Sequence, residues 1–184
     1  MDDEVVTGWA VAAQRGDREA AAAFIRATTP QLHRLMSYLG DPGEVEDLVQ
    51  ETYLRAFAAL SRYAQRSPAR LWLWSIARRV AADQIRRKRR GPRLSAQDWQ
   101  QVLDTRRTVP APATTVEIRT AIAALEPDRR EAFVLTRVAG LSYGEAAAVC
   151  QCPIGTIRSR VYRARLDLLA ALDEHHNSAY GLGS

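Results

Sequence analysis

The stretch LSYGEAAAVCQCPIGTIRSRVYRARLDL, residues 141–168, predicts two helices joined by a short turn. Ser142 and Glu145 have the spacing of a capping box, in which each side chain satisfies a backbone amide of the other residue, so a helix begins there. Pro153 ends that helix and opens the next one, because the first turn of a helix does not need its amide hydrogens.

The second helix of this pair has one apolar and one polar face. Ile157, Val161, Ala164 and Leu168 form a stripe that can pack against the first helix. The other face offers hydroxyl and guanidinium groups, which can bond base edges and phosphates in a major groove. The pair therefore predicts a DNA-binding helix-turn-helix whose second helix is the recognition helix. The alternative is an ordinary solvated helix face.

The rest of the chain also has the spacing of helices. Apolar residues recur every three or four positions, and no stretch alternates as a strand does. We therefore expect an all-α protein of two small helical domains joined by a flexible linker, the C-terminal domain containing the helix-turn-helix. Prolines and fading periodicity place the linker at 91–114, which gives domains over 1–90 and 115–172 and a disordered tail over 173–184.

The N-terminal domain should contain four helices. Thr7 is expected to cap the first helix and Asp17 the second, which Pro30 should kink or break. A third helix follows the turn signal at 41–43, and a fourth spans about 71–90 after a loop.

Charge is unevenly distributed along the 184 residues, whose formal net charge is +5. Residues 1–60 sum to −5, whereas cations gather at 78–93 and 158–165. Two separate basic patches indicate two contacts with a polyanion. A hydrophobic content of 47% excludes wholesale disorder.

No part of the sequence indicates export, a membrane span or a cofactor. The acidic start at 1–4 lacks the features of a signal peptide, and no stretch approaches the roughly 18 apolar residues that a span requires. We therefore expect a cytoplasmic protein without membrane insertion. The only cysteines, Cys150 and Cys152, are too close for an ordinary structural disulfide and do not have zinc-site spacing. We expect no metal, no cofactor and no enzymatic activity, because no catalytic motif is present.

Three motifs occur in the order and at the separation that one known family has. They are the helix-turn-helix residues 141–147 and 152–160, the run EDLVQETYLRA at 46–56, and Trp72-Leu73 with Ile76-Ala77 and Asp83 before Arg86-Arg87. Together they resemble the extracytoplasmic function (ECF) sigma factors, a branch of the sigma-70 family. The resemblance covers about residues 7–172.

The resemblance implies that the C-terminal domain binds the minus-35 element of promoters. The expected contacts with bases and phosphates lie on the recognition helix, at Thr156, Arg158, Ser159, Arg160, Tyr162 and Arg163. Tyr162 could instead belong partly to the core.

The resemblance also implies that the N-terminal domain recognises and opens the minus-10 element, where a loop takes an extruded base beside a cationic helix. The expected contacts are Tyr63, Gln65, Arg66, Arg78, Arg79, Arg86 and Arg87. The run at 63–66 departs from the family's Phe-Arg-Gly-Asp-like run, so the preferred base is not predicted. Trp72 is expected to pack in the core, and Trp74 to contact DNA or a neighbouring helix.

Partners follow from the same resemblance. The helix at 46–56 should bind core RNA polymerase at the β′ clamp helices, through Asp47, Gln50, Glu51 and Arg55. On spacing alone these residues are equally an ordinary solvated face. The β flap of the polymerase and an anti-sigma factor are further expected partners, and the linker should thread toward the polymerase active centre.

The resulting hypothesis is an alternative sigma factor that binds core RNA polymerase, directs it to specific promoters and helps open the minus-10 element. An autonomous helix-turn-helix regulator is the main alternative, but it would not need the acidic helix or the second basic patch. A nucleic-acid enzyme is disfavoured, because the acids lie away from the basic segments in the sequence.

Overall fold

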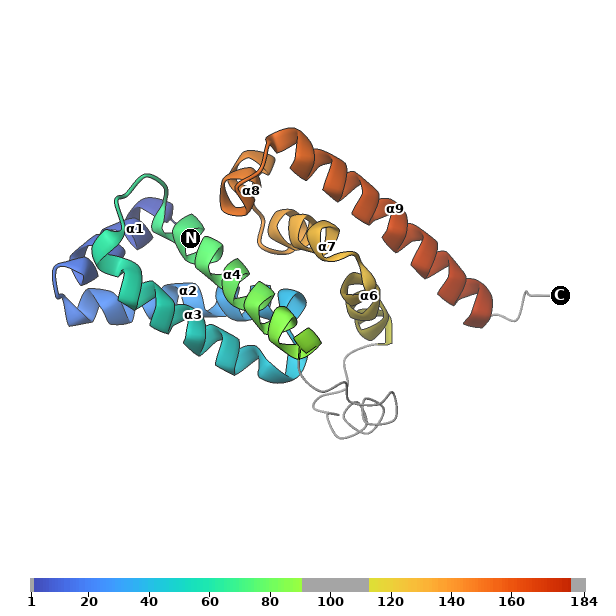
Figure 1. Ribbon diagram of the computed structural model, residues 1–184, viewed down its shortest axis with the longest axis horizontal. Helices are drawn as coiled ribbons and strands as arrows, with labels where there is room; N and C mark the ends of the chain where they lie inside the picture. Colours follow the sequence, from blue (N-terminus) through green and yellow to red (C-terminus); the bar gives the residue numbers. More distant parts are fainter. Residues whose placement is uncertain (1, 91–112, 180–184) are drawn as a thin grey trace.

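The computed structural model describes residues 2–90, the N-terminal half, and 113–179, the C-terminal half, and both are helical without a strand (Figure 1). The predicted all-α class is therefore confirmed. The helices are α1 (Asp3–Gln14), α2 (Arg18–Leu39), α3 (Val45–Ala59), α4 (Ala69–Arg90), α6 (Ala113–Ala124), α7 (Pro127–Phe133), α8 (Tyr143–Cys150) and α9 (Ile154–Ala179). Short helical turns precede α3 at Pro42–Glu44 and follow it at Leu60–Arg62, and a π-helix, η3 (Val134–Val138), continues α7. The predicted linker at 91–114 lies almost wholly outside the described residues.

The first helix begins earlier than predicted. Asp2 is its cap, because the Asp2 carboxylate accepts a hydrogen bond from the Glu4 amide at 2.9 Å. The expected cap Thr7 lies inside α1, and its hydroxyl instead accepts from the backbone amide of Ala69 at the start of α4. Asp17 caps α2 as predicted.

Pro30 does not break α2, which continues to Leu39. Because proline has no amide hydrogen, the carbonyl of Arg26 loses its usual hydrogen-bond donor in the helix. Arg26 and Pro30 both lie on the exposed side of α2, where water can donate to that carbonyl instead. On the buried side, the hydroxyl of Tyr53 in α3 donates to the Ile25 carbonyl at 3.2 Å.

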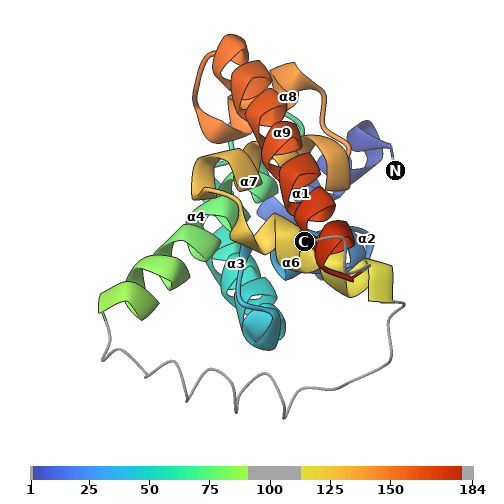
Figure 2. The ribbon, with the colours of Figure 1, turned by 90° about the vertical axis from the view of Figure 1, so that its right-hand side faces the viewer.

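The two halves pack against each other, with α4 next to α8, and α2 next to η3 and α6 (Figures 1 and 2). Their buried apolar side chains form one cluster, which contains Trp74 and Val80 of α4 together with Leu135 and Ile157 of the C-terminal half. The halves therefore share a core in this arrangement.

The predicted helix-turn-helix is present as α8 and α9. Both capping-box bonds form: the Ser142 amide donates to the Glu145 carboxylate at 2.8 Å, and the Glu145 amide donates to the Ser142 hydroxyl at 3.2 Å. Gln151 turns the chain with a φ of 55°. Helix α9 then continues to Ala179, past residue 172, where the domain was predicted to end. Within the described residues, no helix has both the length and the apolar character needed to cross a membrane.

Candidate nucleic-acid and protein interfaces

The outer face of α9 is exposed as the sequence predicts. Ile157, Val161 and Ala164 are buried beneath it. Arg158, Ser159 and Arg163 are exposed above, Thr156 is half-buried at the first turn, and Tyr162 is 64% exposed. Tyr162 therefore belongs to the surface and not to the core. The face presents two guanidinium groups, a hydroxyl and an aromatic ring side by side, as a major-groove contact requires.

Arg160 differs from the other predicted contacts on α9. Its guanidinium pairs with Asp128 of α7 and lies 4.0 Å from the sulfur of Cys152. Arg160 makes these contacts because it lies on the flank of α9 that faces α7. On the same flank, Arg129 of α7 donates a hydrogen bond to Asp167 of α9 at 2.8 Å. In this structure Arg160 joins α9 to α7 and does not point outward with Arg158 and Arg163.

The base-recognition loop was predicted at residues 63–69; because α4 already begins at Ala69, residues 63–68 form the loop that connects the turn after α3 to α4. Gln65 and Arg66 are exposed at its tip. The backbone of Gln65 has a φ of 54°, which is unusual for a residue other than glycine, asparagine or aspartate. Tyr63 is placed differently, being only 4% exposed. Its hydroxyl donates to the Ser67 carbonyl at 2.6 Å, and its ring lies 4.9 Å from that of Trp72. Burial raises the pKa of Tyr63, so its side chain holds the loop as a neutral internal group.

A cavity of about 630 Å³ lies between this loop and α1. One wall consists of loop residues Gln65, Arg66, Ser67 and Pro68. The other wall is a face of α1 made by Asp3, Glu4, Thr7, Gly8, Val11, Ala12 and Arg15. The cavity therefore adjoins the segment that the sequence assigns to an extruded base.

The arginines of α4 point in different directions. Arg79 is exposed, and the spacing of Trp72, Arg79 and Arg86 places all three on one side of the helix. Arg86 is exposed but pairs with Asp83 on the same helix. Arg87 lines a second cavity, of about 510 Å³, with the acidic residues Glu44, Asp47 and Glu51. Thus Trp72, Arg79 and Arg86 share one side of α4, whereas Arg87 lies toward α3.

Arg78 is turned toward the C-terminal half, where it pairs with Glu131 of α7. The Glu131 side chain is only 14% exposed, and desolvation raises its pKa even though Arg78 acts in the opposite direction. Trp74 is fully buried, so the predicted alternative of a DNA contact for this residue is wrong and its ring packs inside the protein.

The acidic surface on α3 is partly exposed and partly paired. Asp47 and Gln50 are exposed. Arg55 donates to Glu51 at 2.7 Å and to Asp83 of α4 at 2.6 Å, so the guanidinium joins α3 to α4. Hydrogen bonds from Arg55 and then Arg86 lower the pKa of Asp83, which keeps this carboxylate charged.

Two apolar residues of the same surface were not predicted. Leu54 is 68% exposed, and Phe57 is also exposed. They follow Asp47 and Gln50 by seven positions each, which places them along the same face of α3. That spacing was a usable signal in the sequence, because an exposed leucine beside exposed polar groups is typical of a protein interface.

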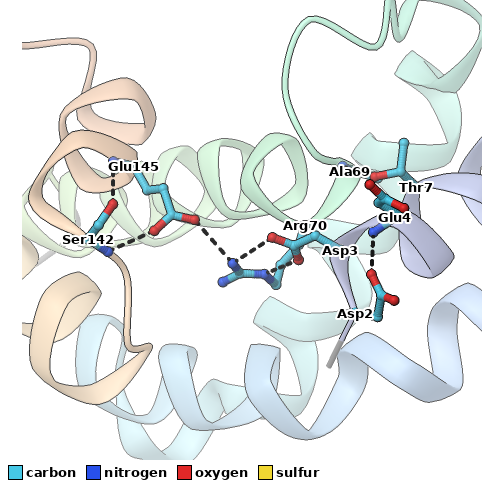
Figure 3. A network of polar contacts seen from close by, with 8 residues as sticks. All are labelled: Asp2, Asp3, Glu4, Thr7, Ala69, Arg70, Ser142 and Glu145. Atoms are coloured by element: carbon cyan, nitrogen blue, oxygen red, sulfur yellow. Dashed lines mark hydrogen bonds and ion pairs between the residues drawn. The ribbon is translucent and has the colours of Figure 1, made fainter.

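Arg70 at the start of α4 connects both halves (Figure 3). It binds Asp3 of α1 through two bonds, at 2.7 and 3.0 Å, and lies 3.4 Å from the capping carboxylate of Glu145 in α8. Another contact between the halves is made by Arg119 of α6, whose guanidinium lies over the ring of Tyr38 in α2, 5.6 Å from the ring centroid. With Arg78 and Glu131, these contacts hold the halves together around their shared core.

The described residues contain no group of three or more His, Cys, Asp or Glu side chains placed to hold a metal ion. Cys150 is buried, and desolvation raises the pKa of its thiol to about 12, so it is a weak nucleophile and a poor metal ligand. The predicted tail histidines, His175 and His176, lie on the last turns of α9.

Comparison with known proteins identifies the family of the chain. Residues 24–91 match the family Sigma-70 region 2, and residues 115–168 match the family Sigma-70, region 4. The chain is 49% identical over 170 residues, 92% of each chain, to a probable RNA polymerase sigma-C factor of Mycobacterium bovis. It is 37% identical to the ECF RNA polymerase sigma factor EcfG of Rhodopseudomonas palustris, over 80% of this chain and 82% of the relative.

Solved structures show the same architecture. CnrH in complex with the cytosolic domain of CnrY superposes with a TM-score of 0.73 at 26% identity, covering 92% of this chain and 98% of CnrH. The sigma factor RpoE of Bartonella quintana, in complex with the anti-sigma factor NepR, gives a TM-score of 0.64 at 31% identity, covering 81% and 94%.

The two helical halves, one matching region 2 and the other region 4, define a transcription initiation factor of the sigma-70 class. The chain belongs to the ECF RNA polymerase sigma factors, as its 49% identity over most of its length shows. It is an alternative sigma factor, and proteins of this class direct initiation without being enzymes.

Proposed function

We propose that this chain binds core RNA polymerase through α3, reads the minus-35 element through α9 and opens the minus-10 element with the 63–68 loop and α4. The observation that carries the proposal is that the exposed cationic face of α9 and the acidic, apolar surface of α3 lie on different halves of one chain. DNA attracts the first surface and repels the second, so one protein can hold a promoter and an enzyme at the same time.

At the minus-35 element, Arg158 and Arg163 are the predicted contacts on α9 that carry an exposed cation. A guanidinium can donate to both acceptors of a guanine or to a phosphate, and the Ser159 hydroxyl and Tyr162 ring lie between them. Thr156, in the first turn, is close to the positive end of the helix dipole and suits a phosphate contact. Arg160, held by Asp128, contributes by orienting α9 against α7.

At the minus-10 element, the cavity beside Gln65 and Arg66 can take a base that leaves the duplex. Arg79 and Arg86, which share one side of α4 with Trp72, would follow the phosphates of the same strand away from the loop. Tyr63 acts indirectly, because its buried hydroxyl fixes the loop at Ser67.

Core polymerase would be bound mainly by α3. Asp47 and Gln50 supply exposed polar groups, and Leu54 supplies the apolar anchor around which interfaces gain most of their affinity. The β′ clamp helices are the proposed partner of this surface. For the β flap we propose the exposed leucines of α9, Leu166, Leu169 and Leu172.

The packing of the two halves against each other limits which arginines of α4 can reach DNA. Arg78 faces Glu131 and not solvent, so a DNA contact by Arg78 requires the halves to separate. CnrH and RpoE were solved with CnrY and NepR bound. We propose that an anti-sigma factor likewise controls this chain, and that the chain acts in the cytoplasm.

The proposal is tested by reconstituting holoenzyme with two variants. Arg163→Ala should lower affinity for minus-35 duplex at least tenfold and leave core polymerase binding unchanged. A combined Asp47→Ala and Glu51→Ala variant should do the reverse. If both folded variants lost both activities in parallel, the assignment of separate surfaces would be wrong.

A further inference from the structure

Helix α1 runs beside the 63–68 loop and holds it at both ends. Thr7 accepts a hydrogen bond from the Ala69 amide at 3.0 Å, where the loop enters α4. Gln14, two turns later on the same side of α1, donates to the carbonyls of Leu60 and Tyr63 at 2.8 and 3.2 Å. Asp3, one turn before Thr7, adds the paired bonds to Arg70.

These bonds restrict the part of the loop that carries the exposed side chains. Tyr63 closes the loop on itself through Ser67, so the two ends of the loop are tied to each other as well as to α1. Gln65 is thereby kept in a left-handed conformation that an unrestrained glutamine would rarely adopt. An ordered loop loses less conformational entropy when it binds a base.

A second face of α1 is directed into the cavity. Glu4, Gly8, Val11 and Arg15 recur at helical spacing, and all four line it. At Gly8, a methyl group added to the backbone would meet no atom within 4 Å. The absence of a side chain at this position therefore leaves open space in the wall opposite the loop.

We propose that α1 forms the second wall of the site that takes the extruded minus-10 base, with Gly8 leaving the room that the base occupies and with Thr7 and Gln14 as positioning residues. The inference rests on the proposed opening of the minus-10 element. It assigns to the first helix of the chain a direct part in that step.

The chemistry of the two walls suits a nucleotide of a single DNA strand. Val11 and Pro68 offer apolar surface against which a base can lie, and the amide of Gln65 can donate to and accept from its polar edge. Arg15 and Arg66 are exposed at the same cavity, where guanidinium groups can approach the flanking phosphates.

Gly8→Leu is the principal test, with Gly8→Ala as the matched control. The probe is a duplex promoter recovered from a randomised library by wild-type holoenzyme, carrying 2-aminopurine at successive non-template positions of its minus-10 element. Gly8→Leu should keep the Tm and the core polymerase affinity of the wild type, because leucine favours a helix more than glycine does. It should lower open-complex formation and the 2-aminopurine signal at one position at least tenfold, whereas Gly8→Ala should change both less than threefold.

Gln14→Glu tests positioning, because the carboxylate has nearly the shape of the amide but cannot donate to the two carbonyls. Discrimination among the four bases at the extruded position should fall at least fivefold, with core polymerase and minus-35 affinities within twofold of wild type. A purely structural role for Gln14 would instead lower the Tm and all three affinities together, and would overturn its assignment.

The outcomes separate this inference from the function on which it rests. If wild-type chain binds core polymerase and opens the promoter but Gly8→Leu does so equally well, α1 is not a wall of the base site. If Gly8→Leu proves unstable, Val11→Trp fills the same cavity from the next turn and must give the same loss. If wild-type chain recovers no promoter at all, the proposed function itself fails.

Discussion

Arg78 of α4 and Glu131 of α7 form an ion pair across the junction of the two halves. The pair uses a cation from the basic stretch at 78–93, which by sequence alone belongs to a DNA-binding helix. In the described arrangement its charge is neutralised by an acid of the other half, and Arg70 is bound both by Asp3 of its own half and by Glu145 of the other half. The charge of α4 is therefore divided between holding the halves together and facing solvent.

Glu131→Lys should shift the protein toward separated halves. Lysine places a second cation beside the partly buried guanidinium of Arg78, and two like charges at a desolvated position repel each other. Small-angle X-ray scattering should show a larger radius of gyration for this variant. Asp128→Lys, on the same helix, makes the same change of charge at an ion pair within the C-terminal half and should leave the radius unchanged. Equal radii for wild type and Glu131→Lys would contradict a role of the pair in closure.

The bond between Asp3 and Arg70 predicts a pH dependence of stability. Hydrogen bonding from Arg70 lowers the pKa of Asp3 below its unfolded value, so the folded state binds the proton less tightly. The resulting stability is fully present above the unfolded pKa, about 3.9, and is lost as the pH falls through the lower folded value. Asp3→Asn should cost about 1 kcal/mol near neutral pH, and the difference from wild type should shrink below about pH 4. Urea unfolding at several pH values measures it. A difference that grew on acidification would have the wrong sign.

Glu131 should show the opposite behaviour, because burial raises its pKa. The pKa of this glutamate is about 4.3 in the unfolded chain and higher in the folded protein. As the pH rises through this range, ionisation of Glu131 therefore lowers the stability of the folded state. The free energy of unfolding of Glu131→Gln and of wild type should be measured over the same pH series. Their difference should change with pH in the opposite sense to the Asp3 difference, and it serves as the control for that experiment.

Gln65→Gly should stabilise the protein and impair base recognition. Glycine adopts a positive φ without steric cost, so the substitution should relieve roughly 1 kcal/mol of local strain. The loop then loses both a side chain at the cavity and a backbone restriction, which should lower discrimination at the minus-10 element. Thermal unfolding and transcription from promoters varied at that element measure the two effects. A less stable Gln65→Gly variant would show that the left-handed turn carries no strain.

Leu54→Ser should weaken core polymerase binding without destabilising the chain. A leucine that is 68% exposed contributes little to the core, but as an apolar anchor in an interface it is worth about 1–2 kcal/mol, which corresponds to roughly fivefold to thirtyfold in Kd. Val5→Ser changes another exposed apolar side chain, on α1, and should leave the Kd unaltered. If both variants bind core polymerase like wild type, the α3 surface lacks the proposed anchor.

Arg163 and Arg160 should differ in their effect on duplex binding. Arg163 is exposed, so Arg163→Ala should weaken binding of the minus-35 duplex and, if a phosphate contact is lost, reduce the slope of log K against log salt by about 1. Arg160 is held by Asp128, so Arg160→Ala should alter the salt slope less and reduce the Tm more. Filter binding over a salt series, combined with thermal unfolding, separates the two residues.

Much of the fold could be predicted because local signals and packing agree. The capping box at Ser142 and Glu145 and the cap at Asp17 depend on neighbouring residues only, and each forms as expected. The start of α1 could not be placed in this way. The Thr7 hydroxyl accepts a hydrogen bond from the amide of Ala69, which is distant in sequence, and Asp2 caps the helix instead.

The surfaces were predictable where the helical period decides exposure, as for the outer face of α9 and for Asp47 and Gln50 on α3. They were not predictable where a contact formed only by tertiary packing or by the shape of a loop holds a side chain. Tyr63 is held by Ser67 and packs on Trp72, Arg160 is held by Asp128, and Arg78 by Glu131. An ionisable or aromatic residue shows its type and its face in the sequence, but the neighbour that satisfies it appears only in the folded structure, either within one half, as Asp128 does for Arg160, or across the two halves, as Glu131 does for Arg78.

The most direct test is transcription in vitro with purified core RNA polymerase, with and without the full chain, followed by mapping of transcript 5′ ends over a library of promoter fragments. We predict a stable complex of chain and core enzyme, and a new set of start sites preceded by two shared sequence elements at fixed spacing. A chain that neither joins core polymerase nor changes where transcripts begin would contradict this prediction.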